Sequence, residues 1–226
     1  MTRPFSIMAK PIGPFCNIDC TYCYYLEKAR LYPDTSRFRM SDGVLARYIE
    51  SHIAAQAAAG LTEPVFYWQG GEPTVLGIES VRRATALPEG TPPHGITGRH
   101  GCHRPRTLPA PGGAAFLAGN RFLVGVSLDG PERLHDRYRR DRAGRPTFGA
   151  VMRGLGHLLG AGVEVNILAT VHRANVVRPK EVYRVLKGLG TPYIQFIPIV
   201  DRQLDETGLH PVQEPDAGSA AGTAWA

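Results

Sequence analysis

The sequence predicts a fold of the α/β class, made of parallel βαβ units. Short apolar runs typical of strands alternate with longer segments whose apolar residues recur at the spacing of a helix. Polar and glycine-rich residues gather where the apolar runs end, which is where both barrels and doubly wound sheets place their sites. With 226 residues, 43% of them hydrophobic, the chain can bury one sizeable core.

The order of the elements follows from these runs. Strands are predicted at residues 5–9, 65–68, 122–128, 163–171 and 193–197. Ser41 is expected to be the N-cap of a helix that continues until Gly60, and Thr147 to cap a second helix. Residues 182–189 carry a third helical stripe, and residues 78–87 are weakly helical.

Composition excludes several classes of protein. No run of eighteen apolar residues predicts a membrane span, and residues 1–10 lack the apolar stretch of a signal peptide. We therefore expect a cytoplasmic location, which suits reduced cysteines, and no membrane partner. The net charge is +6, but the arginine-rich stretch at residues 133–145 holds few aromatic residues and is interrupted by acidic ones. No nucleic-acid partner is expected.

Cys16, Cys20 and Cys23 lie within eight residues at the spacing C-x3-C-x2-C. One loop of this kind can ligate three irons of a [4Fe–4S] cluster and leave the fourth iron open to a small molecule. Three thiolates could also hold zinc with one open position, and a disulfide or packing cysteines are further alternatives. The remaining cysteine, Cys102, stands alone.

A second motif, Gly70-Gly71-Glu72-Pro73, follows the strand predicted at residues 65–68. Paired glycines let the backbone come close to a ligand, and Glu72 adds a carboxylate that could hold an ammonium group. Taken alone, the motif is an ordinary turn after a strand. The predicted topology places it on one rim with the cysteine loop, Ser127 and Gln195.

The cysteine loop and the Gly-Gly-Glu-Pro motif together resemble the radical S-adenosylmethionine (SAM) superfamily. Further motifs resemble one of its families, the anaerobic sulfatase-maturating enzymes, from about residue 5 to residue 200. These motifs are Trp68-Gln69-Gly70-Gly71-Glu72-Pro73-Thr74, Val124-Gly125-Val126-Ser127-Leu128-Asp129-Gly130-Pro131, His135-Asp136-Arg137-Tyr138-Arg139 and Tyr193-Ile194-Gln195-Phe196-Ile197.

The resemblance implies a partial (β/α)6 barrel, with a doubly wound Rossmann-like sheet as the alternative, and a [4Fe–4S] cluster and SAM as cofactors. An electron from the cluster, delivered by a donor such as ferredoxin or flavodoxin, would cleave SAM to a 5′-deoxyadenosyl radical. This radical would start the oxidation of a Cys or Ser of a sulfatase polypeptide to Cα-formylglycine.

The resemblance also implies a role for individual residues. Those that would bind SAM are Tyr22 and Ile194 at the adenine, Gly70, Gly71 and Glu72 at the amino group, and Ser127 and Arg139 at the ribose and carboxylate. Gln69 and Tyr25 would face the substrate. The structural alternatives are core packing for Tyr22 and Tyr25, a turn residue for Ser127, and a solvated charge for Arg139.

Residues 88–113 depart from the family. They are rich in proline, glycine, arginine and histidine, and lack both apolar alternation and the Leu-Gln-Thr-Asn-Gly type of motif that ends a barrel strand in the family. We expect the third βα unit to be degraded and its strand to be lost. A compensated reading-frame slip in the gene is our hypothesis for this segment.

The end of the chain also departs from the family. A radical SAM core is expected at residues 1–200 and an unstructured tail at residues 201–226. The family continues into a cysteine-rich SPASM region with two auxiliary clusters and an acidic catalytic residue, and neither is expected here. Formylglycine formation is therefore expected to be impaired. The alternatives are a SPASM-type enzyme that modifies a ribosomal peptide, a non-catalytic remnant, or a zinc-binding module.

Overall fold

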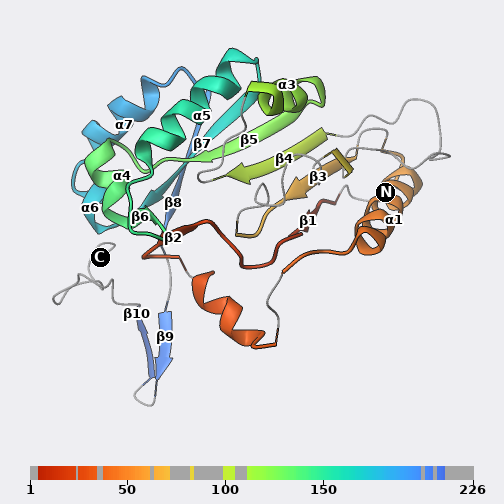
Figure 1. Ribbon diagram of the computed structural model, residues 1–226, viewed down its shortest axis with the longest axis horizontal. Helices are drawn as coiled ribbons and strands as arrows, with labels where there is room; N and C mark the ends of the chain where they lie inside the picture. The colour runs from red at the N-terminus through yellow and green to blue at the C-terminus, as the bar shows by residue number, and fades with distance from the viewer. Residues whose placement is uncertain are drawn as a thin grey trace.

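The computed structural model describes residues 5–23, 25–34, 38–61, 64–71, 82–83, 99–104, 111–199, 202–205 and 208–211 (Figure 1). Its centre is a six-stranded sheet in the order β1-β3-β4-β5-β7-β8, and every neighbouring pair is parallel. The strands are β1 (Ile7–Ala9), β3 (Val65–Trp68), β4 (Arg99–Arg104), β5 (Phe122–Ser127), β7 (Glu164–Val171) and β8 (Tyr193–Pro198).

The strand order favours the barrel over the doubly wound alternative. Along the sheet the strands follow one another in chain order, without the reversal that makes the switch point of a doubly wound sheet. Among the described strands, β1 and β8 remain at the two edges, so the barrel is not closed. The prediction of a partial barrel with parallel strands is therefore confirmed at this level.

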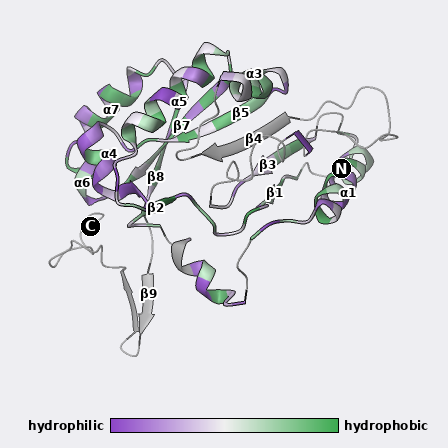
Figure 2. Cartoon of the chain, viewed as in Figure 1, coloured by the Kyte–Doolittle hydropathy of each residue, from purple (hydrophilic) through white to green (hydrophobic). Residues whose placement is uncertain are grey.

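Helices cover the outer side of the sheet, as Figure 1 shows for α3, α5 and α7. The bounds of the helices are α1 (Asp42–Ala58), α3 (Pro111–Gly119), α4 (Glu132–Tyr138), α5 (Phe148–Gly160), α6 (Arg173–Val176), α7 (Pro179–Lys187) and the 3-10 helix η1 (Leu26–Leu31). Hydrophilic and hydrophobic residues share α1, α5 and α7 (Figure 2), and several of the hydrophobic ones join the core, among them Ile53, Leu155 and Leu186. No helix in the described ranges is long and apolar enough to cross a membrane.

The core lies between these helices and the sheet. Side chains that are at most 2% exposed come from both layers: Ile53, Phe66, Leu117, Phe122, Val124, Val126, Val151, Leu155, Leu158, Val165, Ile167 and Leu186. At about 25 cal/mol for each Å² of apolar surface, burial of each large side chain contributes about 1.5–3 kcal/mol. This core fixes the strands whose carboxyl ends carry the candidate site.

Strand β4 contradicts the expectation that the third strand is lost. Its backbone pairs in parallel register with β3 and with β5, for example Cys102 opposite both Trp68 and Val124. Backbone amides and carbonyls can form hydrogen bonds whatever the side chains are. Without a strand between them, the facing edges of β3 and β5 would have unpaired amides and carbonyls, and β4 supplies the partners. The sequence pattern was therefore a poor guide to the backbone here, although the family motif is still missing. Residues 88–98 and 105–110 lie outside the described residues, as do most of residues 78–87.

Within residues 201–226, which were predicted to be an unstructured tail, the structure describes residues 202–205 and 208–211. The antiparallel strands β9 (Arg202–Asp205) and β10 (Gly208–Pro211) form a two-stranded sheet. An antiparallel pair needs only a short connection, and its backbone hydrogen bonds do not require the apolar periodicity on which the prediction relied. Residues 212–226 lie outside the described residues.

Of the two predicted N-caps, Ser41 caps α1 with its side chain, but Thr147 does not cap α5. The Ser41 hydroxyl accepts a hydrogen bond from the Val44 amide at 3.3 Å, as predicted for the N-cap of α1. Thr147 occupies the N-cap position of α5, but its side chain makes no capping bond. The Asp136 carboxylate caps α5 instead, because it accepts from the backbone amides of Thr147 at 2.7 Å and Phe148 at 2.8 Å. The Thr147 hydroxyl is used elsewhere and donates to the Arg139 carbonyl.

The glycine pair after β3 packs against the loop that leads into the cysteines. The Gly71 amide donates to the Gly13 carbonyl at 2.9 Å, and a Cβ atom on Gly71 would lie 1.8 Å from the carbonyl oxygen of Phe15. Gly70 has φ +120°, a conformation that side-chain-bearing residues rarely adopt. Glycine is therefore required here by the approach of two backbone segments, and this approach fixes the loop just before Cys16.

Replacing Gly71 by Ala should destabilise the protein by about 1–3 kcal/mol or more, because the new methyl group overlaps the backbone of Phe15. Gly156→Ala is the matched control: Gly156 lies in α5 with open space around it, so alanine should add about 0.5–1 kcal/mol of helix stability. Urea unfolding measures both changes. A Gly71→Ala protein as stable as the wild type would contradict the close approach.

Candidate functional site

The three cysteines lie on one loop that carries the short strand β2 (Ile18–Cys20). Cys16 and Cys20 are buried, at 8% and 5% exposure, and Cys23 is half-buried; none of the three is in a disulfide. The Cys23 amide donates to the Cys20 carbonyl at 2.8 Å, which turns the chain back between them. Cys20 and Cys23 thus lie on one tight turn, and Cys16 and Cys20 have little access to water.

Strand β2 is held by the short strand β6 (Arg139–Asp141). The two strands are antiparallel, and Cys20 lies opposite Arg139. The guanidinium of Arg139 is buried, and its Nη1 atom lies 4.0 Å from the Cys20 sulfur. Burial raises the pKa of the Cys20 thiol to about 12, and the Arg139 charge opposes this rise. The cation therefore offsets part of the cost of burying the thiolate at Cys20, the form that binds iron.

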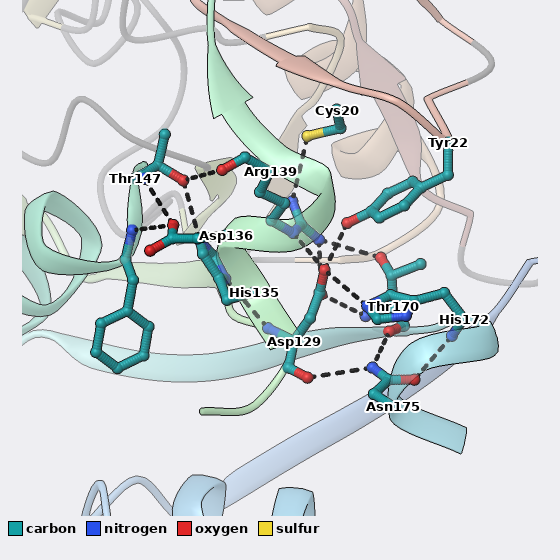
Figure 3. A network of polar contacts seen from close by, with 11 residues as sticks. Cys20, Tyr22, Asp129, His135, Asp136, Arg139, Thr147, Thr170, His172 and Asn175 are labelled. Atoms are coloured by element: carbon teal, nitrogen blue, oxygen red, sulfur yellow. Dashed lines mark hydrogen bonds and ion pairs between the residues drawn. The ribbon is translucent and has the colours of Figure 1, made fainter. Parts of the chain in front are cut away.

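The Arg139 charge is balanced by Asp129, a fully buried carboxylate just after β5 (Figure 3). Arg139 Nε donates to Asp129 Oδ2 at 2.7 Å, and Nη2 donates to Oδ1 at 3.0 Å. Burial alone would raise the pKa of the Asp129 carboxyl, but Arg139 outweighs it and holds that pKa below its usual value. Burial alone would lower the pKa of Arg139, and Asp129 reverses this effect. Both groups are therefore charged.

Tyr22 joins the same network from the cysteine loop. Its hydroxyl donates to Asp129 Oδ2 at 2.6 Å, and the Arg139 guanidinium lies 5.4 Å from its ring centre. Its ring also stacks on His172 with centroids 5.8 Å apart. Burial raises the pKa of the Tyr22 hydroxyl, so the group is a hydrogen-bond donor at neutral pH. The cysteine loop is thus tied to the sheet through Tyr22 as well as through β6.

The structure brings some of the predicted site residues together at the carboxyl ends of the strands. Gln69, Gly70 and Gly71 follow β3, and Ser127 ends β5. Ser127 is in register with Leu168, which is in register with Gln195, so Ser127 and Gln195 share one row of the sheet. Ser127 is at the end of β5, as predicted, whereas Gln195 lies three residues before the end of β8. Ile194 lies in the adjacent row, opposite Ile167.

Arg139 and Tyr25 lie in surroundings that the sequence did not predict. Arg139 is not the solvated charge considered as its alternative, because the partner described above lets it be buried. Tyr25 accepts a hydrogen bond from the Lys10 ammonium, which also lies 4.7 Å from its ring centre. Glu72 lies outside the described residues.

Sequence reasoning missed Asp129, Thr170 and Asn175 as parts of the site. Thr170 donates its amide to Asp129 Oδ1 at 2.9 Å, and its hydroxyl accepts from Arg139 Nη2 at 3.1 Å. Asn175 donates to the carbonyls of Asp129 and Thr170, and so links the ends of β5 and β7. Asp129 could have been found, since it is a polar residue directly after a predicted strand, which is the signal that identified Ser127.

The donor set of the loop fits an iron–sulfur cluster. Three thiols at the C-x3-C-x2-C spacing are a donor set that iron–sulfur clusters use, and the buried Arg139 cation beside Cys20 would offset part of the negative charge of the thiolates. Among the described residues, no group of three or more His, Cys, Asp and Glu side chains could hold a single metal ion. Cys16, Cys20 and Cys23 are the residues that could hold the cluster.

Comparison with known proteins agrees with this donor set. The family model of the radical SAM superfamily matches residues 11–186. Serine-type anaerobic sulfatase-maturating enzymes from Bacteroides thetaiotaomicron and Klebsiella aerogenes are 38% and 37% identical, over 88% and 87% of this chain and 47% of each enzyme. A cysteine-type enzyme from Clostridium perfringens is 31% identical over 92% of this chain and 55% of its own length.

Solved structures show the same relationship. The structure of native anSMEcpe with bound AdoMet superposes with a TM-score of 0.79 at 30% identity, over 90% of this chain and 54% of that one. Streptococcus suis SuiB, at 13% identity and a TM-score of 0.60, shares the fold. The chain spans about half the length of the curated relatives it matches. This chain belongs to the radical SAM superfamily, and it is homologous to the N-terminal part of the anaerobic sulfatase-maturating enzymes.

Proposed function

We propose that this chain is a radical SAM enzyme of the sulfatase-maturating type, with a [4Fe–4S] cluster on Cys16, Cys20 and Cys23. When bound, the cluster and SAM supply a 5′-deoxyadenosyl radical that begins the oxidation of a substrate Cys or Ser to Cα-formylglycine. The observation that carries this proposal is the buried cysteine loop clamped by Arg139, at the rim where the polar strand ends meet. Superfamily membership supports the same chemistry.

The protein contributes position, charge and exclusion of water. Arg139 would meet the SAM carboxylate with its Nη1 corner, since its other two nitrogens are engaged by Asp129. Tyr22 and Ile194 are proposed to lie beside the adenine and Ser127 beside the ribose. Gly70, Gly71 and Glu72 are proposed at the amino group. The burial of Cys16 and Cys20 would keep water from the ligating sulfurs.

The substrate is proposed to be a segment of a sulfatase polypeptide that approaches Gln69 and Tyr25. The sulfatase-maturating enzymes are 30–38% identical to this chain, whereas SuiB is 13% identical and supports the fold alone. This difference favours a sulfatase over the alternative of a small ribosomal peptide. A low-potential donor such as ferredoxin or flavodoxin would supply the electron.

Anaerobic reconstitution with iron and sulfide tests the cluster. The wild-type chain should hold about four irons and release 5′-deoxyadenosine when reduced in the presence of SAM. Cys20→Ala should lose the cluster and the nucleoside, because a cubane corner loses its thiolate. Iron analysis and chromatography of the nucleoside measure both.

Cys102→Ala is the matched control, since Cys102 lies in β4 and outside the loop, and it should keep both iron and nucleoside release. Retention of a full cluster and of SAM cleavage in Cys20→Ala would contradict the ligand assignment. Stoichiometric zinc in the wild type, without nucleoside release, would favour the zinc-binding module.

A sulfatase peptide containing the target Cys or Ser tests the substrate. The reduced chain is expected to release 5′-deoxyadenosine in the presence of this peptide. Mass spectrometry of the peptide detects formylglycine. Gln69→Ala should reduce any conversion while leaving the iron content unchanged. Efficient conversion that is insensitive to Gln69→Ala would show that the substrate does not use this position.

A further inference from the structure

The Asp129–Arg139 pair has more hydrogen bonds than are needed to neutralise the two charges. Both oxygens of Asp129 accept two donors each: Tyr22 and Arg139 Nε at Oδ2, and Arg139 Nη2 and the Thr170 amide at Oδ1. The carboxylate is therefore unable to rotate without losing bonds in a site with no access to water. Its plane is fixed by β5, β7 and the cysteine loop at once.

This fixed plane sets the direction of the guanidinium. A two-point pair through Nε and Nη2 leaves Nη1 as the remaining corner, and this corner lies 4.0 Å from the Cys20 sulfur (Figure 3). Thr170 adds a third restraint, because its hydroxyl accepts from Nη2 at 3.1 Å. The Nη1 corner consequently points to Cys20 of the cysteine loop.

The backbone that carries Asp129 is restrained as well. Asn175 donates to the Asp129 carbonyl at 3.1 Å. The next residue, Gly130, has φ +122°, and a Cβ atom there would lie 3.1 Å from the side chain of Val182 in α7. The backbone that carries the carboxylate is therefore restrained by Asn175 and by the packing of Gly130 against α7.

From this geometry we propose that Asp129 is the positioning residue for SAM: it orients Arg139 so that Nη1 meets the SAM carboxylate next to Cys20. Asp129 itself does not touch SAM. The inference rests on the proposed function, since it requires a cluster-bound SAM. It adds that the affinity for SAM depends on the carboxylate of Asp129, which contacts Arg139 and not SAM.

Asp129→Asn, Arg139→Gln and the double variant test the proposal on the anaerobic, cluster-loaded full chain. The amide of Asn presents donors where Arg139 Nε and Tyr22 need an acceptor, so the guanidinium loses its orientation. Each single variant should bind SAM about 10- to 100-fold more weakly. Because Asp129 acts through Arg139, the double variant should bind no more weakly than Arg139→Gln. Equilibrium dialysis with labelled SAM measures these affinities without turnover.

Asp136→Asn is the matched control. Asp136 is also a buried acid of the same segment, but it caps α5, so its replacement should leave SAM affinity unchanged. Thr170→Val is a milder variant that removes only the hydroxyl acceptor of Nη2, and it should show a smaller loss with iron content unchanged. If Asp129→Asn does not fold, Thr170→Val and Arg139→Gln still decide the proposal, since wild-type affinity in both would overturn it.

Other results separate this inference from the proposed function. Wild-type affinity in a folded Asp129→Asn protein, or additive losses in the double variant, would overturn the positioning role and leave the proposed function intact. An equal loss in Asp136→Asn would also overturn it, because the effect would then follow from general destabilisation. A wild-type chain that takes up iron but never binds SAM would overturn both.

Discussion

The buried ion pair between Asp129 and Arg139 is the interaction on which the candidate site depends. A single buried charge is strongly unfavourable, and loss of one partner of such a pair costs about 3–5 kcal/mol. The pair is tolerated because both oxygens of Asp129 accept hydrogen bonds, and because Nε and Nη2 of Arg139 donate to that carboxylate. Such a pair adds little net stability, so its value lies in the geometry that it imposes.

That geometry links segments that are far apart in the chain. Tyr22 and Cys20 belong to the cysteine loop, Asp129 follows β5, Arg139 begins β6, and Thr170 lies near the carboxyl end of β7. The parallel sheet brings these ends to one rim, and the hydrophobic core holds them there. The loop is therefore positioned by charge at one side and by the close approach of Gly71 to Phe15 at the other.

The sequence predicted the strands of the sheet where apolar runs are long, as in β5, β7 and β8. It did not predict β2 or β6, since three-residue strands carry too little periodicity to be detected. It also assigned the cap of α5 to Thr147, whereas Asp136 supplies it from another helix. Strand β4 shows the opposite case, in which backbone pairing forms a strand where the side-chain pattern indicates none.

The sequence by itself indicated the superfamily: the spacing of Cys16, Cys20 and Cys23 and the glycine pair after β3 are local patterns that a short segment carries alone. Only the tertiary structure decided how the loop is held. Asp129 and Arg139 are ten residues apart and lie on different elements, and the burial that makes their charges depend on each other exists only after β5, β6 and β7 have packed. Electrostatic coupling of this kind is a property of the low-dielectric interior, which the sequence does not display.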